Sequence, residues 1–167
     1  MMRMSRIGWA AALAALVLFC VAQEPTYAAG QWAAPPSASA YSIPNTVLLQ
    51  PADLNRILHT QGGEKPLMLH VGSRMLFDES HIPQSEYIGP GGQEEGIQAL
   101  RNRVAKLPRN TFLVIYCGCC PWGHCPNMGP AYQLLAGMGF TRVKALYLAN
   151  NFGTDWVSKG YPVEGAH

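Results

Sequence analysis

The chain has 167 residues, of which 49% are hydrophobic and 13% are charged. This length leaves room for one ordinary globular core and excludes a second core of similar size. Lys and Arg number 12 against 10 Asp and Glu, for a net charge of +2. Export would remove Arg3 and Arg6 and leave the mature chain near neutrality, which excludes a basic surface for nucleic acid.

The first residues predict an export signal. Arg3 and Arg6 precede an apolar run, residues 7–21, which is short for a membrane span. We therefore expect a signal peptide over residues 1–22, with cleavage as late as residue 28 as an alternative and an uncleaved anchor as another. The expected location is periplasmic or otherwise exported, with no stable membrane insertion after cleavage.

Residues 23–42 are rich in Ala, Pro and Ser and predict a flexible linker. A domain over residues 43–165 follows, in which apolar β-rich runs alternate with segments of helical periodicity. Such alternation predicts an α/β fold: a single domain with a mainly parallel sheet and helices on both faces. The expected strands are 67–71, 112–116 and 143–148. The expected helices begin near Pro51, Glu95 and Ala131, with a last short helix capped by Thr154, and a loop is expected over 77–92.

A cysteine-rich loop joins the central strand to the following helix. It contains Cys117, Cys119, Cys120 and Cys125, together with His124, within nine residues. Structural thiols rarely crowd in this way, and backbone N–H groups at a helix start can stabilise an anionic thiolate or persulfide. The loop is therefore the predicted centre of chemistry.

Several short motifs, taken together, resemble the rhodanese family over residues 43–164. The resemblance implies a rhodanese-like domain in which a cysteine at the end of the central strand, here Cys117, accepts sulfane sulfur. It further implies a small sulfur-donor anion and a thiol acceptor as partners, and no cofactor. The motifs are His81-Ile82-Pro83, Tyr116-Cys117, Gly137-Met138-Gly139-Phe140 and Asn150-Asn151-Phe152 with Trp156, Gly160 and Pro162.

The loop also departs from the family pattern. Similar enzymes have a compact loop with an arginine that holds the anionic substrate, whereas this loop is longer and contains none. Position after the strand favours Cys117 as nucleophile, while the spacing to Gly123 favours Cys120. Where similar domains place an aspartate followed by an arginine, this chain has His70-Val71-Gly72.

These considerations predict a persulfide site in the loop, with a second cysteine resolving the persulfide and His124 replacing the arginine. Trp122 is expected to be exposed and to wall the pocket or face a partner. His70 and His81 are expected to be packing residues. The predicted catalytic residues are Cys117, Cys120, Cys125 and His124, and the predicted substrate-binding residues are Gly118, Cys119, Trp122 and Gly123.

Three other interpretations of the same loop remain open. The cysteines and His124 offer soft ligands for Cu(I) or Zn, which would suit a metal-binding module. Residues 117–120 form a C-x-x-C motif, as in thiol-disulfide oxidoreductases. The four cysteines could also form two structural disulfides in an oxidising compartment.

Overall fold

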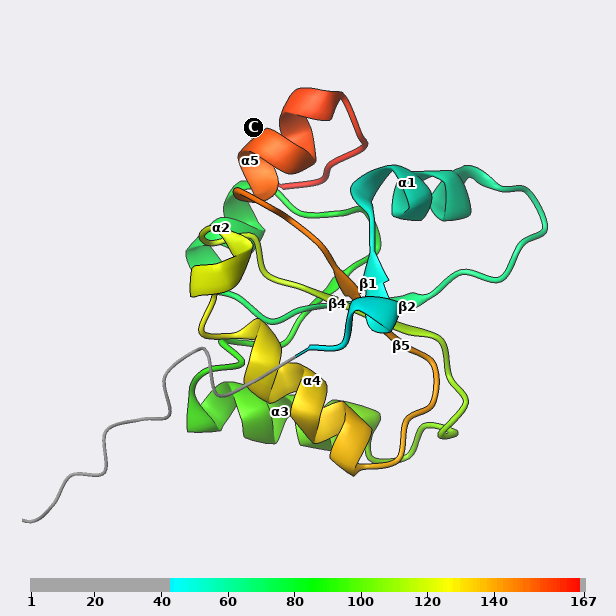
Figure 1. Ribbon diagram of the computed structural model, residues 1–167, viewed down its shortest axis with the longest axis vertical. Helices are drawn as coiled ribbons and strands as arrows, with labels where there is room; N and C mark the ends of the chain where they lie inside the picture. Colours follow the sequence, from blue (N-terminus) through cyan, green and yellow to red (C-terminus); the bar gives the residue numbers. More distant parts are fainter. Residues whose placement is uncertain (1–42, 166–167) are drawn as a thin grey trace, which may run out of the picture. The chain divides into compact units, whose positions relative to one another are not determined.

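The computed structural model describes residues 43–165, so the predicted signal peptide and linker lie outside the described residues. Within that range, no helix combines the length and apolar character needed to cross a membrane. Figure 1 shows strands and helices alternating along the chain. The helices are α1 (Pro51–His59), α2 (Arg74–Glu79), α3 (Glu94–Val104), α4 (Met128–Gly137) and α5 (Phe152–Asp155).

One parallel sheet of five strands organises the domain, in the order β1-β5-β4-β2-β3. The central strand β4 pairs with β2 on one side and with β5 on the other. The three predicted strands therefore share one sheet, as expected, with helices on both faces. The strands are β1 (Leu48–Leu49), β2 (Leu67–His70), β3 (Glu86–Tyr87), β4 (Leu113–Tyr116) and β5 (Val143–Leu146).

Successive side chains of β4 point to opposite faces of the sheet, so they belong to two separate layers of the core. All four residues of β4 are buried, as is usual for a strand covered on both faces. Leu113 and Ile115 pack with α3 and α4, whereas Val114 and Tyr116 pack with α1 and the α5 region. Cys117 continues this alternation and joins the layer formed by α3 and α4. Its side chain is thereby directed toward the start of α4.

The sequence interpretation was wrong in two places. The second half of α2, and the whole of β3, which pairs with β2, lie inside residues 77–92, which we expected to be a loop. Both elements are too short to give a periodic signal, and β3 is defined by its neighbour in the sheet. The cap of α5 is Asn151, whose side chain accepts a hydrogen bond from the backbone N–H of Thr154 at 2.8 Å. Thr154 itself lies within the helix.

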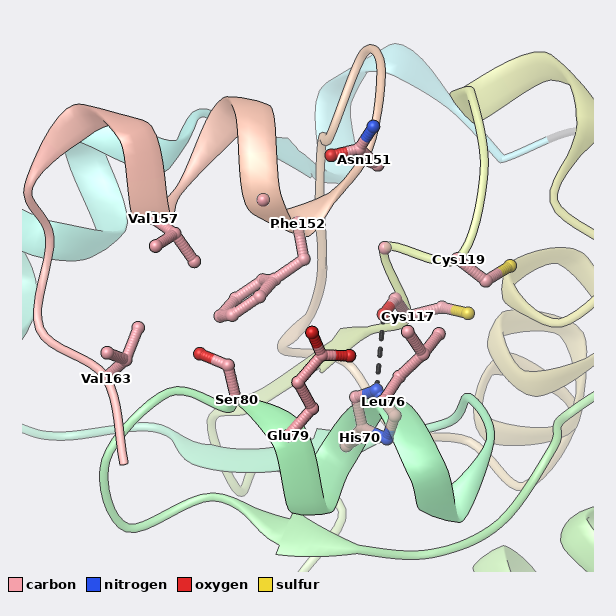
Figure 2. Close-up of a pocket in the computed structure, with 12 residues that line it drawn as sticks. His70, Leu76, Glu79, Ser80, Cys117, Cys119, Asn151, Phe152, Val157 and Val163 are labelled. Atoms are coloured by element: carbon pink, nitrogen blue, oxygen red, sulfur yellow. Dashed lines mark hydrogen bonds between the residues drawn. The ribbon is translucent and has the colours of Figure 1, made fainter. Parts of the chain in front are cut away.

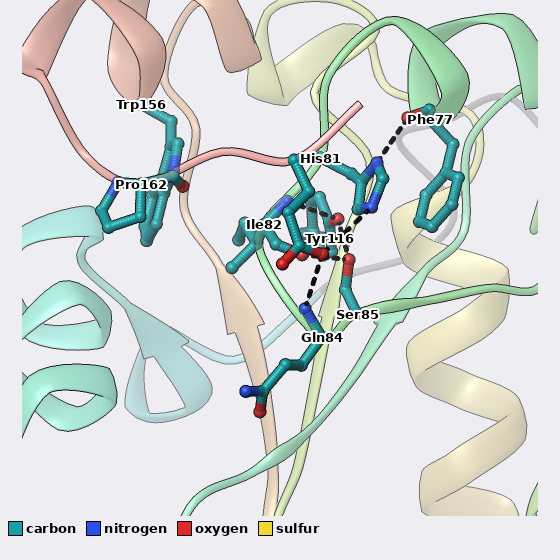
Figure 3. A network of polar contacts seen from close by, with 9 residues as sticks. Phe77, His81, Ile82, Gln84, Ser85, Tyr116, Trp156 and Pro162 are labelled. Atoms are coloured by element: carbon teal, nitrogen blue, oxygen red, sulfur yellow. Dashed lines mark hydrogen bonds and ion pairs between the residues drawn. The ribbon is translucent and has the colours of Figure 1, made fainter. Parts of the chain in front are cut away.

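The turn at His81 connects the sheet to the C-terminal segment (Figure 3). The Nδ1–H of His81 donates to the carbonyl of Phe77 at 2.7 Å, and the two rings stack with centroids 3.9 Å apart. The backbone N–H of His81 donates to the carbonyl of Glu164 at 2.7 Å. Beside this turn, the hydroxyls of Ser85 and Tyr116 lie 2.7 Å apart. These contacts give His81 the turn and packing role that we expected.

Candidate functional site

Three cysteine sulfurs meet beyond the carboxyl end of β4. Cys117 follows the last residue of the strand and is 2% exposed, Cys125 is also buried, and Cys119 is exposed. The sulfur atoms of these three residues all lie within 4.8 Å of one another. We call Cys117, Cys119 and Cys125 the sulfur cluster. Ligands of open α/β sheets bind at this edge, so the cluster occupies the position where chemistry is expected.

Cys120 lies beside the cluster and is not part of it. Its sulfur is 3.1 Å from that of Cys119, which in turn is 3.9 Å from that of Cys125. All four of these cysteines are free thiols, so the described loop contains no disulfide. Cys119 is therefore the sulfur that contacts both Cys120 and Cys125. Of the two cysteines in the C-x-x-C motif, Cys117 belongs to the sulfur cluster and Cys120 does not.

Negative charge in the cluster is favoured at Cys125. Hydrogen bonds from the thiols of Cys117 and Cys119 lower the pKa of Cys125, burial opposes the shift, and the backbone N–H groups of Asn127 and Met128 lower the pKa further. These two N–H groups belong to the start of α4, where helix donors are free to bind an anion. The pKa of Cys119 is raised by its contacts with Cys117 and Cys125 and by burial. The start of α4 therefore favours the thiolate form of Cys125.

Asn127 is a site residue that sequence reasoning missed. It is 8% exposed, and its Nδ2 donates to the sulfur of Cys117 at 3.3 Å. Its Oδ1 accepts the backbone N–H of Gly92 at 2.9 Å, which fixes the amide so that Nδ2 faces the sulfur. An asparagine directly before a helix is a common capping signal and could have drawn attention to this position.

His70 supports Cys117 from the neighbouring strand. Its Nε2–H donates to the carbonyl of Cys117 at 3.2 Å. Burial lowers the pKa of His70 from 6.5 to about 4, although the hydrogen bond to Cys117 opposes the shift, so the ring is neutral near pH 7. Gly72 leaves space here, because a Cβ at that position would lie 2.8 Å from His70 and 3.0 Å from the Cys117 sulfur. His70 is buried as expected, and it also positions the loop.

A cavity of about 530 Å³ borders this loop, and Cys117, Gly118 and Cys119 form part of its wall. Figure 2 shows the sulfurs of Cys117 and Cys119 pointing away from Phe152 and Val157, which line the cavity. The lining includes the carboxylate of Glu79 and no Lys or Arg among the described residues. The cavity is therefore poorly suited to a small oxyanion, although two residues of the sulfur cluster, Cys117 and Cys119, lie in its wall.

The other predicted site residues differ in their exposure and in their contacts with the rest of the domain. His124 is exposed and lies outside the three-sulfur group, and Gly123 is exposed beside it. The expected exposure of Trp122 is wrong, because its ring is half-buried and packs 5.3 Å from the ring of Tyr147. Gly118 has a φ of +75° and its carbonyl accepts the N–H of Phe152 at 3.1 Å. This position needs glycine, since a Cβ would lie 2.6 Å from the side chain of Phe152.

Comparisons with known proteins agree with this fold. No family model matches the chain. No curated protein matches it either. Among solved structures, the BH2092 protein from Bacillus halodurans is similar, with 26% identity, a TM-score of 0.54, and coverage of 70% of this chain and 75% of that chain. The rhodanese-like domain of the Alr3790 protein from Anabaena sp. has 21% identity and a TM-score of 0.54, over 72% of this chain and 80% of that chain.

Proposed function

We propose that this rhodanese-like domain moves sulfane sulfur through its cysteine loop, as a sulfurtransferase or a persulfide carrier. The fold supports a sulfurtransferase-type domain. The observation that carries the proposal is the convergence of three cysteine sulfurs within 4.8 Å at the carboxyl edge of the central strand. Thiols at this spacing can exchange a sulfur atom with small movements of their side chains.

Sulfur enters the loop by thiol-persulfide exchange. The thiol of Cys117, which lines the cavity, attacks the outer sulfur of a donor persulfide, the donor S–S bond breaks, and the donor leaves as a thiol. Cys117 now carries the persulfide. An acceptor thiol removes the sulfur by the same exchange, and no external oxidant or reductant is required.

The surroundings of the cluster suit an anionic persulfide. Nδ2 of Asn127 donates to the Cys117 sulfur, and the backbone N–H groups at the start of α4 lower the pKa of Cys125. Such donors replace water around a buried anion. Cys125 or Cys120 could instead attack the inner sulfur of a Cys117 persulfide, which would release hydrosulfide and leave a disulfide. His124, at the exposed side of the loop, is the proposed contact for an anionic donor.

Intact mass measurement tests the proposal. Reduced protein is treated with glutathione persulfide or with thiosulfate, desalted, and weighed without reductant. We expect the wild-type protein to gain the mass of one sulfur, which cyanide removes. The Cys117→Ser variant should gain none, Cys125→Ser should load but release sulfur slowly, and Cys120→Ser is the matched control that should load normally.

Two results would change the interpretation. If Cys117→Ser loads normally and Cys120→Ser does not, Cys120 is the carrier. If the wild-type protein never gains a cyanide-labile sulfur from either donor, the sulfur-transfer proposal is wrong. Circular dichroism of each variant separates loss of the carrier from loss of the fold, because Cys117 is buried.

A further inference from the structure

The sulfur cluster has the dimensions of a metal site with three thiolate ligands. A metal–sulfur bond of about 2.3 Å places the sulfurs of a planar three-coordinate site about 4.0 Å apart. In the structure, the sulfurs of Cys119 and Cys125 are 3.9 Å apart, and all three cluster sulfurs lie within 4.8 Å of one another. Small rotations of the side chains would therefore bring the three sulfurs onto one ion.

We propose that the cluster binds a single Cu(I) ion through Cys117, Cys119 and Cys125. Soft thiolate ligands without nitrogen or oxygen partners favour Cu(I), which accepts three ligands. Structural Zn²⁺ requires four ligands in a tetrahedron, with sulfurs about 3.8 Å apart. Cys120 cannot supply the fourth as it stands, since its sulfur is only 3.1 Å from that of Cys119, and His124 lies outside the group.

The shell around the cluster supports this assignment. Nδ2 of Asn127 lies 3.3 Å from the Cys117 sulfur and 3.9 Å from the Cys119 sulfur. Donors of this kind orient metal-bound thiolates and neutralise part of their charge. The ligands are therefore held by the same contacts that anchor the loop to α4.

The three cysteines of the sulfur cluster differ in their exposure to solvent, and this sets the order in which they would contact an incoming ion. Cys119 is exposed, whereas Cys117 and Cys125 are buried. An incoming ion would meet Cys119 first and would then be enclosed by the two buried sulfurs. Binding converts the cysteines to thiolates and releases their remaining protons to solvent, so no change in oxidation state is required.

Competition with a Cu(I) chelator tests the inference. Reduced, desalted full chain is titrated without oxygen against the Cu(I) complex of bathocuproine disulfonate, whose absorbance reports the copper that remains on the chelator. We expect the protein to remove one equivalent. Cys119→Ser is the main variant because its side chain is exposed, and it should weaken binding by at least about 10-fold. Cys120→Ser and His124→Ala are matched controls and should bind within about threefold of wild type.

Several outcomes would overturn the proposal. They are no copper uptake by the wild-type protein, a loss in Cys120→Ser or His124→Ala as large as in Cys119→Ser, or tighter binding of Zn²⁺ with a fourth ligand. X-ray absorption of the copper complex should show three sulfur neighbours and no nitrogen. The titration uses no sulfur donor and the persulfide assay uses no metal, so each proposal can fail while the other stands.

Discussion

Asn127 and Cys117 are joined by a side-chain hydrogen bond in which Nδ2 of the amide donates to Sγ at 3.3 Å. The other end of the amide is held by the N–H of Gly92. The sulfur at the end of β4 is thus positioned by the start of α4 and by a turn that precedes α3. Because Asn127 links both segments to the Cys117 sulfur, we first predict the effect of replacing its side chain.

Replacing Asn127 with Asp should reduce sulfur loading about 10- to 100-fold. Asp can still accept the N–H of Gly92, but it offers no donor to Cys117 and places a negative charge beside the persulfide, at a cost of about 1.5–3 kcal/mol. The measurement is the rate at which the mass of one sulfur is gained. Asn110→Asp, at an exposed position, makes the same charge change and should load normally. Equal rates for the two variants would show that the Asn127 contact has no part in the chemistry.

Substitution of Gly91 with Ala should destabilise the domain by about 1–3 kcal/mol. A Cβ at Gly91 would lie 2.4 Å from the backbone oxygen of Asn127, and backbone cannot move aside cheaply. Urea unfolding measures the effect. Gly137→Ala is the control: no atom lies within 4 Å of its added Cβ, and this helical position should gain about 0.5–1 kcal/mol. A Gly91→Ala variant as stable as wild type would contradict the close approach.

Stability should fall below pH 6.5 because of His70. Burial lowers its pKa in the folded protein from 6.5 to about 4, so between these values the unfolded chain binds a proton that the folded chain does not. The contribution is complete above pH 6.5 and is lost as the pH falls toward 4, by about 3 kcal/mol over the whole window.

The measurement for His70 is the urea midpoint at several pH values from 7 down to 4.5. His70→Gln can still donate to the Cys117 carbonyl but does not titrate, so its midpoint should vary less with pH in this window. His59→Gln replaces an exposed histidine and should keep the wild-type slope. The burial argument would be refuted by a His70→Gln variant whose midpoint falls as steeply as that of wild type.

The N-terminal residues predict export, and N-terminal sequencing can test this. In a bacterial host we expect the mature chain to begin near Gln23 or Ala29 and to be recovered from the periplasm. A variant with Arg3 and Arg6 replaced by Glu should remain unprocessed, because the positive n-region is required. Recovery of soluble cytoplasmic protein that still begins at Met1 or Met2 would count against export.

The sequence was most informative where its signals are local. The run before Cys117 is apolar and β-branched, so β4 and its neighbours could be predicted, and crowded cysteines marked the loop. The arrangement of the sulfurs could not be predicted, because it depends on the path of an irregular loop. The role of Asn127 depends on Gly92, 35 residues earlier in the chain, and only the folded structure brings the two together.

Cys119 contacts the sulfurs of Cys117, Cys120 and Cys125, but a sulfur can form only one disulfide. A disulfide between the adjacent residues Cys119 and Cys120 is strained, so oxidation favours a pair within the sulfur cluster. In an oxidising compartment, one such disulfide would consume two of the three cluster thiols and leave the third as a lone thiol. Any role of the cluster there depends on a reductant that restores it.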